Sequence, residues 1–322
     1  MKTLLEIFKV LLAVAIPLAS LATGLRAARV EPGWLTRRPG LFARALFALL
    51  VLLPVGTVLF LQSIAAPPLV RAGLTIAVVA IGIGPPAVFG HVKAHARAQA
   101  AAPAEAQAAG DALSFEISLN VVLLAISIVY VPAFIAVHGM FFQHHLHLAP
   151  AAIAKVVLGR ALVPLAVGVA LGRFAPRLVG PVVRYAGLFV QLVLLLVVVF
   201  AIAVTWRELM GLGLRTWLTC VAVVLAEIVI GYLLGGPAQE TRRVLASFSA
   251  MRFPALALLI ASIAPRAKEL TPVILAYVLT SFVLVSIQSA ITAPRSKMRG
   301  AAGRGPREPR LFGGVPSGSG AS

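Results

Sequence analysis

Long apolar runs separated by short polar segments extend along most of the chain. Nine of these runs are long enough to cross a hydrocarbon layer of about 30 Å as helices. They cover residues 7–25, 41–62, 67–90, 112–138, 150–172, 181–205, 213–236, 244–264 and 271–293. The segments between the runs are too short to form a soluble domain. The pattern therefore predicts an all-α integral membrane protein with about nine transmembrane helices.

Two of these runs carry an interruption within the apolar stretch. The sequence GIGPPAV places Pro85 and Pro86 in the third run, and MRFPA places Arg252 and Pro254 in the eighth. Proline removes a backbone donor and clashes with the preceding turn. Unpaired backbone groups persist at membrane depth only inside protein or beside a water-filled cavity. We therefore expect two broken helices that expose main-chain groups to a ligand.

The two interrupted runs lie five runs apart, so the chain divides into four spans followed by five. An odd offset gives the two parts opposite orientations, which is the inverted-repeat arrangement of secondary transporters. We expect a first repeat at residues 1–138, with its broken helix at about 67–98, and a second at 150–293, with its broken helix at about 244–264. In such proteins the substrate site forms where the broken helices meet.

Composition strengthens the membrane assignment and suggests an orientation. The 322 residues are 60% hydrophobic and 12% charged, with a mean hydropathy of +1.00, which is more apolar surface than a soluble core buries. Most Lys and Arg residues outside the spans fall in the tail 294–322, expected to be disordered, or in loops on its side. This bias predicts a plasma (inner) membrane protein with its N-terminus outside and its C-terminus in the cytoplasm.

The net charge of +18 is thus interpreted as a topology signal, with contacts to lipid headgroups and none to nucleic acid. Cys220 is the only cysteine, so no internal disulfide can form. The sequence contains no nucleotide-binding loop and no nucleophile elbow, so neither an ATP-driven pump nor a hydrolase is expected.

Several segments, in this order and spacing, resemble a known family. They are RRPGLFARALFALLVLLPV (37–55), the proline break of the third run, GDALSFEISLNVVLLAISIVYVPAF (110–134), IGYLLGG (230–236) and RFPALAL (252–258). Together they resemble the bile acid:sodium symporter family over roughly residues 8–293, in its nine-span form. The resemblance implies a panel domain of spans 1, 5 and 6, a core domain of the other spans, and two crossing broken helices. It also implies alternating access and an organic anion as substrate, which the family is best known for carrying with sodium.

The positions that match that family's sodium ligands have mostly changed. By motif they fall on Gly90, His91, Ser114, Ser118, Phe248, Arg252 and Leu49. Only Ser114 and Ser118 keep oxygen donors, whereas a hard cation needs several, and a guanidinium repels a cation. Sodium is therefore the least favoured coupling ion, no cofactor or metal is expected, and proton coupling, uniport or exchange stay open.

Arg252 is the most informative single residue. A charge at the centre of a span costs at least about 2.5–3.5 kcal/mol on insertion scales, so it should face the bundle interior and have a partner. One interpretation is a structural ion pair with Glu116 or Glu227. The other is a fixed cation that holds an anionic substrate at the crossing point. The two are compatible if Glu116 and the substrate compete for Arg252.

Polar residues around the first break are further candidates. His91 and Lys93 form a second cationic pole, with His91 able to titrate near neutral pH; the alternative is a loop histidine and a lysine that snorkels to the interface. The loop segment FFQHHLHL contains three histidines without a carboxylate or cysteine, which favours a loop without metal. These histidines are His144, His145 and His147.

The fourth run carries a polar group of its own. Glu116 lies between Ser114 and Ser118 and could carry a proton, and Asn120 follows four residues later on a similar face. Glu227, on the seventh run, is interpreted either as a core polar residue or as a gate.

The sequence therefore predicts a secondary transporter of a small organic anion, not an enzyme. The expected substrate-binding residues are Arg252, His91, Lys93, Ser114, Ser118, Glu116 and Asn120, and the expected helix breaks are Pro85, Pro86 and Pro254. One alternative is efflux of an inorganic oxyanion such as arsenite, which the absence of a cysteine near the first break disfavours. The other is a non-transporting membrane sensor on the same fold.

Overall fold

The computed structural model describes residues 17–28, 38–81, 103–142, 158–174, 202–262 and 266–292, with isolated positions between these ranges. Within them the chain is helical apart from short connections, and no strand occurs there. Besides a helix at 17–27, the elements are α3 (Pro39–Phe47), η1 (Ala48–Leu52), α4 (Leu53–Ser63), α5 (Pro68–Val79), α7 (Pro103–Phe142), η2 (Leu158–Leu162), α9 (Val163–Phe174), α11 (Trp206–Met210), α12 (Leu214–Leu234), α13 (Gln239–Ala250), α14 (Pro254–Ser262) and α15 (Ala267–Ile291).

Four helices within the described ranges are long and apolar enough to cross a membrane. They are Pro39–Ser63, which joins α3, η1 and α4, Gly110–Val137 within α7, and the whole of α12 and α15. Each matches one of the nine apolar runs. The shorter apolar helices α5 and α9 fall in two further runs, and the eighth run is divided between α13 and α14. The described part of the chain is thus helical and contains four helices long and apolar enough to span a membrane, as in a membrane protein.

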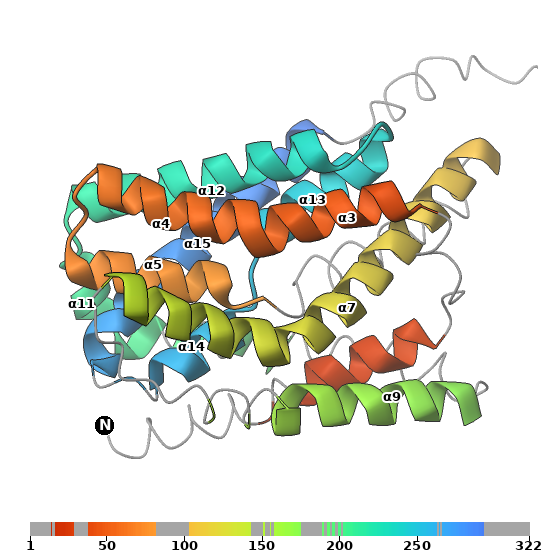
Figure 1. Cartoon of the computed structure of the whole chain (residues 1–322), viewed down its shortest axis with the longest axis horizontal. Helices are drawn as coiled ribbons and strands as arrows, with labels where there is room; N and C mark the ends of the chain where they lie inside the picture. The colour runs from red at the N-terminus through yellow and green to blue at the C-terminus, as the bar shows by residue number, and fades with distance from the viewer. Residues whose placement is uncertain are drawn as a thin grey trace, which may run out of the picture.

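The long helices form one bundle, and a pair of helices lies beside it (Figure 1). Within the bundle α12 packs against α13 and α15, α5 packs against α15, and α13 packs against α7. The helix at 17–27 lies along α9. There, a Cβ on Gly24 would lie 2.9 Å from the Val169 nitrogen, and a Cβ on Gly168 would lie 3.0 Å from the Leu25 nitrogen. Glycine at both positions lets the two backbones touch, as is common between helices in membranes.

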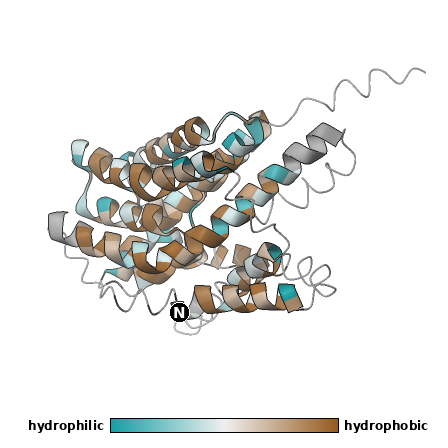
Figure 2. Cartoon of the chain, turned by 45° about the vertical axis from the view of Figure 1, so that its right-hand side comes forward, coloured by the Kyte–Doolittle hydropathy of each residue, from teal (hydrophilic) through white to brown (hydrophobic). Residues whose placement is uncertain are grey.

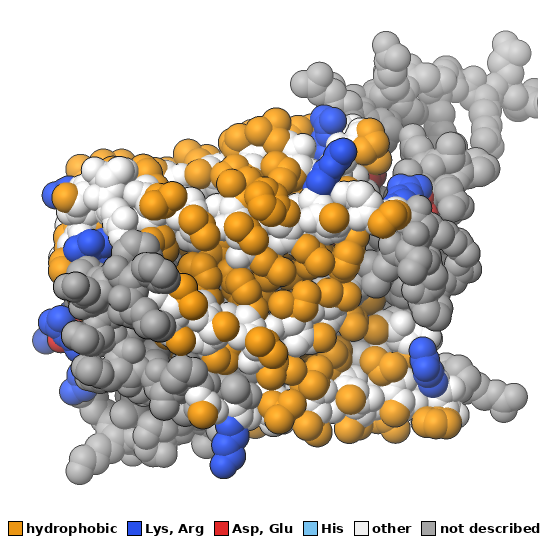
Figure 3. Space-filling view, viewed as in Figure 1, with side chains coloured by type: hydrophobic (Ala, Val, Ile, Leu, Met, Phe, Trp, Pro, Cys, Tyr) orange, Lys and Arg blue, Asp and Glu red, His pale blue; other side chains and the backbone are white. Residues whose placement is uncertain are grey.

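The outer surface of the bundle is apolar over its middle and basic toward its ends. Hydrophobic residues dominate the helices in Figure 2, and in Figure 3 most Lys and Arg side chains lie at the two edges of a broad hydrophobic face. Arg38, just before α3, and Arg242, in the first turns of α13, lie at the same end of the bundle. The contact between Gly236, in the α12–α13 connection, and Leu41 of α3 brings these helix starts together. Arg215 marks the other end, where its Nη2 donates to the Ile64 carbonyl at 2.6 Å. An apolar belt between two basic rims fits a bilayer.

Helices extend beyond the apolar runs at several ends. α7 begins at Pro103, although the apolar run starts at 112, and α13 begins at Gln239, although its run starts at 244. The added turns contain alanines and charged residues with high helix propensity, and proline is favoured in the first turn of α7. The limits of an apolar run are set by contact with lipid, whereas the limits of a helix are set by helix propensity and capping residues. The two sets of limits therefore differ.

The helix from Pro39 to Ser63 contains a π-helical turn, η1, just before Pro54. Pro54 lacks the N–H that would bond to the carbonyl four residues earlier, which belongs to Leu50. Tyr130 of α7 supplies a replacement, since its hydroxyl donates to the Leu50 carbonyl at 2.5 Å. The proline thus explains both the widened turn and the link between this helix and α7.

Small residues also let α12 and α13 pack closely. A Cβ on Gly231 would lie 2.8 Å from the Ala246 Cα, and a Cβ on Gly235 would lie 2.9 Å from the Arg242 nitrogen. Gly236 has φ +83°, a left-handed conformation that glycine adopts at helix C-termini. The segment IGYLLGG therefore forms the end of α12 and the tight turn that leads into α13.

Candidate functional site

Two unwound segments meet inside the bundle. α5 ends at Val79, and Ala80 leaves the helix with φ −68° and ψ 67°. α13 ends at Ala250, Met251 has φ −94° and ψ 85°, and the chain becomes helical again at Pro254. The Phe253 N–H donates to the Ala80 carbonyl at 3.0 Å, so the non-helical end of α5 and the break between α13 and α14 are joined main chain to main chain. In Figure 1 the non-helical residues 80–81 that follow α5 meet the non-helical residues 251–253 between α13 and α14.

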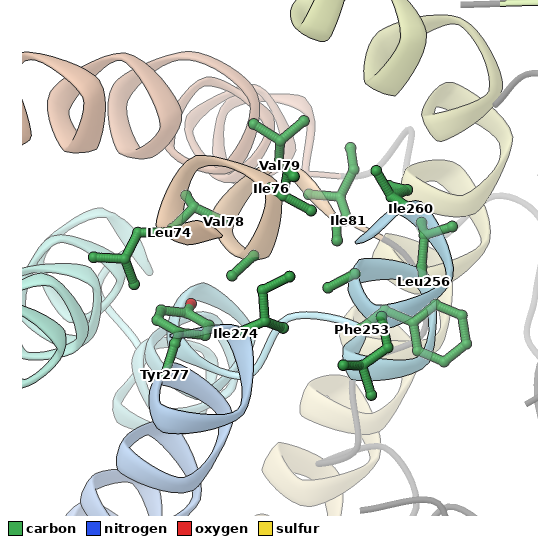
Figure 4. Packing of buried hydrophobic residues seen from close by; sticks show 14 of the residues in the cluster. Leu74, Ile76, Val78, Val79, Ile81, Phe253, Leu256, Ile260, Ile274 and Tyr277 are labelled. Carbon is green, nitrogen blue, oxygen red and sulfur yellow. The ribbon is translucent and has the colours of Figure 1, made fainter. Parts of the chain in front are cut away.

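Hydrophobic side chains surround this meeting point. Figure 4 shows those of α5 and its unwound end, of the break between α13 and α14, of α14 and of α15, including Leu74, Ile76, Val78, Val79, Ile81, Phe253, Leu256, Ile260 and Ile274. Backbone polar groups in such surroundings need partners. The Phe253 carbonyl accepts from the Leu256 and Ala257 N–H groups, both at 3.1 Å, and thereby starts α14.

Arg252 lies in the unwound segment and is only 6% exposed. Its Nε lies 3.8 Å from Glu227 Oε1, and Glu227, on α12, is 1% exposed. This distance allows attraction but exceeds that of a hydrogen bond. Among the described residues, Arg252 Nε and Nη2 and Glu227 Oε1 have no hydrogen-bond partner. The pair is therefore buried and ionic, with donors and an acceptor left over.

Tyr277 of α15 completes the cluster. Its hydroxyl lies 2.7 Å from Glu227 Oε2, to which it donates, and 3.1 Å from the Ala250 carbonyl. Ala250 is four residues before Pro254, so the proline leaves that carbonyl without its helical donor. Three elements, α12, α15 and the break, thus place a carboxylate, a hydroxyl and a guanidinium together in an otherwise apolar core.

The structure decides between the two partners expected for Arg252. The ion pair is made with Glu227, whereas Glu116 of α7 is attracted by Arg26 at the end of the helix at 17–27. Arg252 also acts electrostatically on Tyr130, further along α7. With a rise of about 1.5 Å per residue, Glu116 lies about 21 Å before Tyr130 along the helix.

The other polar residues of α7 are placed near Glu116. Ser118 and Asn120 are buried, and Ser114 is half-buried. Their role in binding substrate stays a prediction. Pro85, Pro86, His91, Lys93 and the histidines His144, His145 and His147 lie outside the described residues.

Two of the positions matched to sodium ligands are occupied by hydrocarbon. Leu49 is 0% exposed within η1, and Phe248 is 3% exposed on α13. Neither side chain offers an oxygen to a cation, and Arg252 brings a positive charge to a third position.

Tyr277 was not among the residues predicted from the sequence. The sequence did contain a sign of it, because Pro254 lacks the N–H that would bond the Ala250 carbonyl, which therefore needs a donor from another helix. The sequence does not say which helix supplies it. Comparison of the chain with protein-family models and with curated proteins finds no match in either.

Proposed function

We propose that this protein is a secondary transporter that moves a small organic anion across the membrane by alternating access. The observation that carries the proposal is the buried guanidinium of Arg252 in an unwound segment that is bonded to a second unwound segment. Unwound backbone at membrane depth is tolerated where it lines a binding site. A buried cation whose N–H donors are left without acceptors favours an anionic ligand that can supply them.

An inverted repeat of four and five spans is supported by matching parts of the two halves. α5 and α13 both have 12 residues, and each is followed by non-helical residues. α5 packs on α15, the last helix of the second half, and α13 packs on α7, the last helix of the first. In Figure 1 α5 and α13 run in opposite directions across the bundle. Exchange of partners between halves is what a pseudo-two-fold axis in the membrane plane produces.

The separate helix pair supports a division into two domains. The helix at 17–27 and α9 pack through Gly24 and Gly168, beside the bundle that contains both interruptions. In the proposal this pair belongs to the panel domain, and the bundle is the core domain that rocks against it. The repeats at 1–138 and 150–293, and a cytoplasmic tail at 294–322, belong to the same proposal.

Arg252 is proposed to bind the anionic group of the substrate. A guanidinium offers paired N–H donors that match an oxyanion, and at least two nitrogens of Arg252 lack an acceptor among the described residues. α14 begins two residues later, so the positive end of its helix dipole is nearby. Ser114, Ser118, Glu116, Asn120, His91 and Lys93 are retained as predicted contributors.

The test is transport by the purified protein in phosphatidylcholine and phosphatidylglycerol vesicles. Suitable probes are labelled gluconate, p-aminohippurate and taurocholate, organic anions that cross lipid slowly. We expect saturable exchange of at least one probe and no dependence on sodium. Absence of exchange for all three would count against transport of organic anions, and binding without flux would favour a sensor. Steep sodium dependence would show that a cation site exists.

Arg252→Gln should lower probe affinity by about 30-fold or more, because removing one partner of a buried charged contact costs about 2–5 kcal/mol. Arg243→Gln is the matched control, since Arg243 lies on α13 and pairs with Glu240 at 2.7 Å near its start. Equal affinity of Arg252→Gln and the wild type would refute the assignment.

A further inference from the structure

Glu227 is held in a position that two hydrogen-bond arrangements can satisfy. The Tyr277 hydroxyl lies within reach of both Glu227 Oε2, at 2.7 Å, and the Ala250 carbonyl, at 3.1 Å. A hydroxyl has one proton and donates fully to one acceptor at a time, while its oxygen can also accept. With Glu227 ionised, Tyr277 donates to the carboxylate. With Glu227 protonated, the acid can donate to the Tyr277 oxygen while Tyr277 donates to Ala250.

Both arrangements leave the Glu227–Tyr277 contact intact. The second arrangement exists because Pro254 leaves the Ala250 carbonyl without its helical donor, and Tyr277 is placed to serve it. A buried carboxyl with a neighbour that both donates and accepts is equipped to gain and lose a proton without leaving an unsatisfied group.

The charges near Glu227 lead to the same conclusion. The groups that act on it from adjoining elements are Arg252 and Tyr277. The other charged residues on the helices packed against α12 lie toward the ends of those helices or face outward. Among the described residues these are Arg44 of α3, Glu240, Arg242 and Arg243 of α13, and Lys268 and Glu269 of α15. The charge state of the site therefore depends on the Glu227–Arg252 pair.

An anion that binds Arg252 changes this balance. The resting pair is neutral, and adding a monovalent anion leaves two negative groups beside one guanidinium in a core of low dielectric. The 3.8 Å separation without a hydrogen bond shows that Glu227 does not hold Arg252 in a closed salt bridge. A proton on Glu227 restores neutrality, and Tyr277 is already placed to accept a hydrogen bond from the acid.

We propose that Glu227 is the proton-binding group that couples anion transport to protons. As a carboxylate it is the counter-ion of Arg252 in the empty site, and it takes up one proton when an organic anion replaces it there. One proton then travels with each monovalent anion in the same direction. This inference rests on the transport function proposed above and names its coupling ion.

The first experiment needs no transported substrate. Infrared difference spectra of the full-length protein in vesicles, recorded while the pH is lowered, should show a carboxylic acid band in the wild type. Glu227→Gln should lack this band, Tyr277→Phe should shift its frequency and its pH midpoint, and the control Glu269→Gln, at an exposed pair, should keep it. An unchanged spectrum in Glu227→Gln would overturn the proposal. Tyr277→Phe keeps the test decisive if Glu227→Gln fails to fold.

The second experiment measures proton uptake when a probe anion binds, with a pH indicator in weakly buffered solution. The ratio of protons taken up to anions bound should be about one in the wild type and in Glu269→Gln, and about zero in Glu227→Gln, as linkage requires for a single coupled group. Exchange of the anion without proton uptake would overturn proton coupling and leave the transport function standing. A titrating Glu227 without binding or exchange of any probe would refute transport and leave the proton site standing.

Discussion

Replacing Tyr130 by phenylalanine removes one hydroxyl and leaves the ring in place. That hydroxyl donates to the Leu50 carbonyl at 2.5 Å, and the ring contacts Phe134 with centroids 5.7 Å apart. The carbonyl has lost its helical donor because the residue four positions later is Pro54. The substitution therefore tests whether the tyrosine acts as the replacement donor.

The expected cost follows from the surroundings of this bond. A net hydrogen bond contributes about 1 kcal/mol, and leaving a buried acceptor unsatisfied costs about 1–3 kcal/mol. Side-chain hydrogen bonds between membrane helices average about 0.6 kcal/mol and reach about 1.7. Tyr130 is partly buried, so we expect Tyr130→Phe to lower the free energy of unfolding by about 1–1.5 kcal/mol.

A double-mutant cycle separates this effect from general loss of packing. Pro54→Ala restores an N–H that can bond to the Leu50 carbonyl, so in that background Tyr130→Phe should cost close to nothing. Equilibrium unfolding in mixed micelles with increasing sodium dodecyl sulfate measures all four proteins. An equal cost of Tyr130→Phe with and without Pro54 would refute the reasoning, because the tyrosine would then act independently of the proline.

Three further outcomes test the packing. Gly231→Val should destabilise the protein by about 1–3 kcal/mol and lower its thermal unfolding temperature, because the new Cβ would meet the Ala246 Cα at 2.8 Å. The control Gly56→Val, where a Cβ would have nothing within 4 Å, should hardly change that temperature. Similar shifts for the two variants would contradict close packing of α12 on α13. Gly168→Leu should also lower that temperature, since it forces the helix at 17–27 away from α9, and an unchanged value would place the helix pair elsewhere. The Cys220 thiol, 0% exposed, should react with a maleimide only after unfolding, and rapid labelling of the folded protein would contradict its burial.

Hydropathy predicted four of the long apolar helices because lipid selects for apolar length, and the count of nine spans stays a prediction. The runs at 41–62, 112–138, 213–236 and 271–293 each correspond to a long apolar helix. Their ends were less predictable, because charged and alanine-rich turns such as those at the start of α7 continue the helix beyond the lipid. The second interruption was also readable, since Pro254 cannot continue a helix from the preceding turn.

The composition of the site was only partly readable. The sequence showed that Arg252 needs a partner, but Glu116 and Glu227 were equal candidates, because hydropathy does not report how a helix is rotated about its axis. Rotation and register are set by close packing, here by the contact of Gly231 with α13, which lies one turn beyond Glu227 on the same face. Tyr277 was missed for the same reason: it lies far from Pro254 in sequence and meets its carbonyl only through tertiary packing.

The hydrogen bond from the Phe253 nitrogen to the Ala80 oxygen uses no side-chain atom. Substitutions at these two positions change what surrounds the bond but leave its donor and acceptor in place, with proline at 253 the exception. The side chains around this bond can therefore change while the main-chain link between the two segments persists. The side chains that set the chemistry of this site and the main-chain atoms that join its two segments are therefore different atoms.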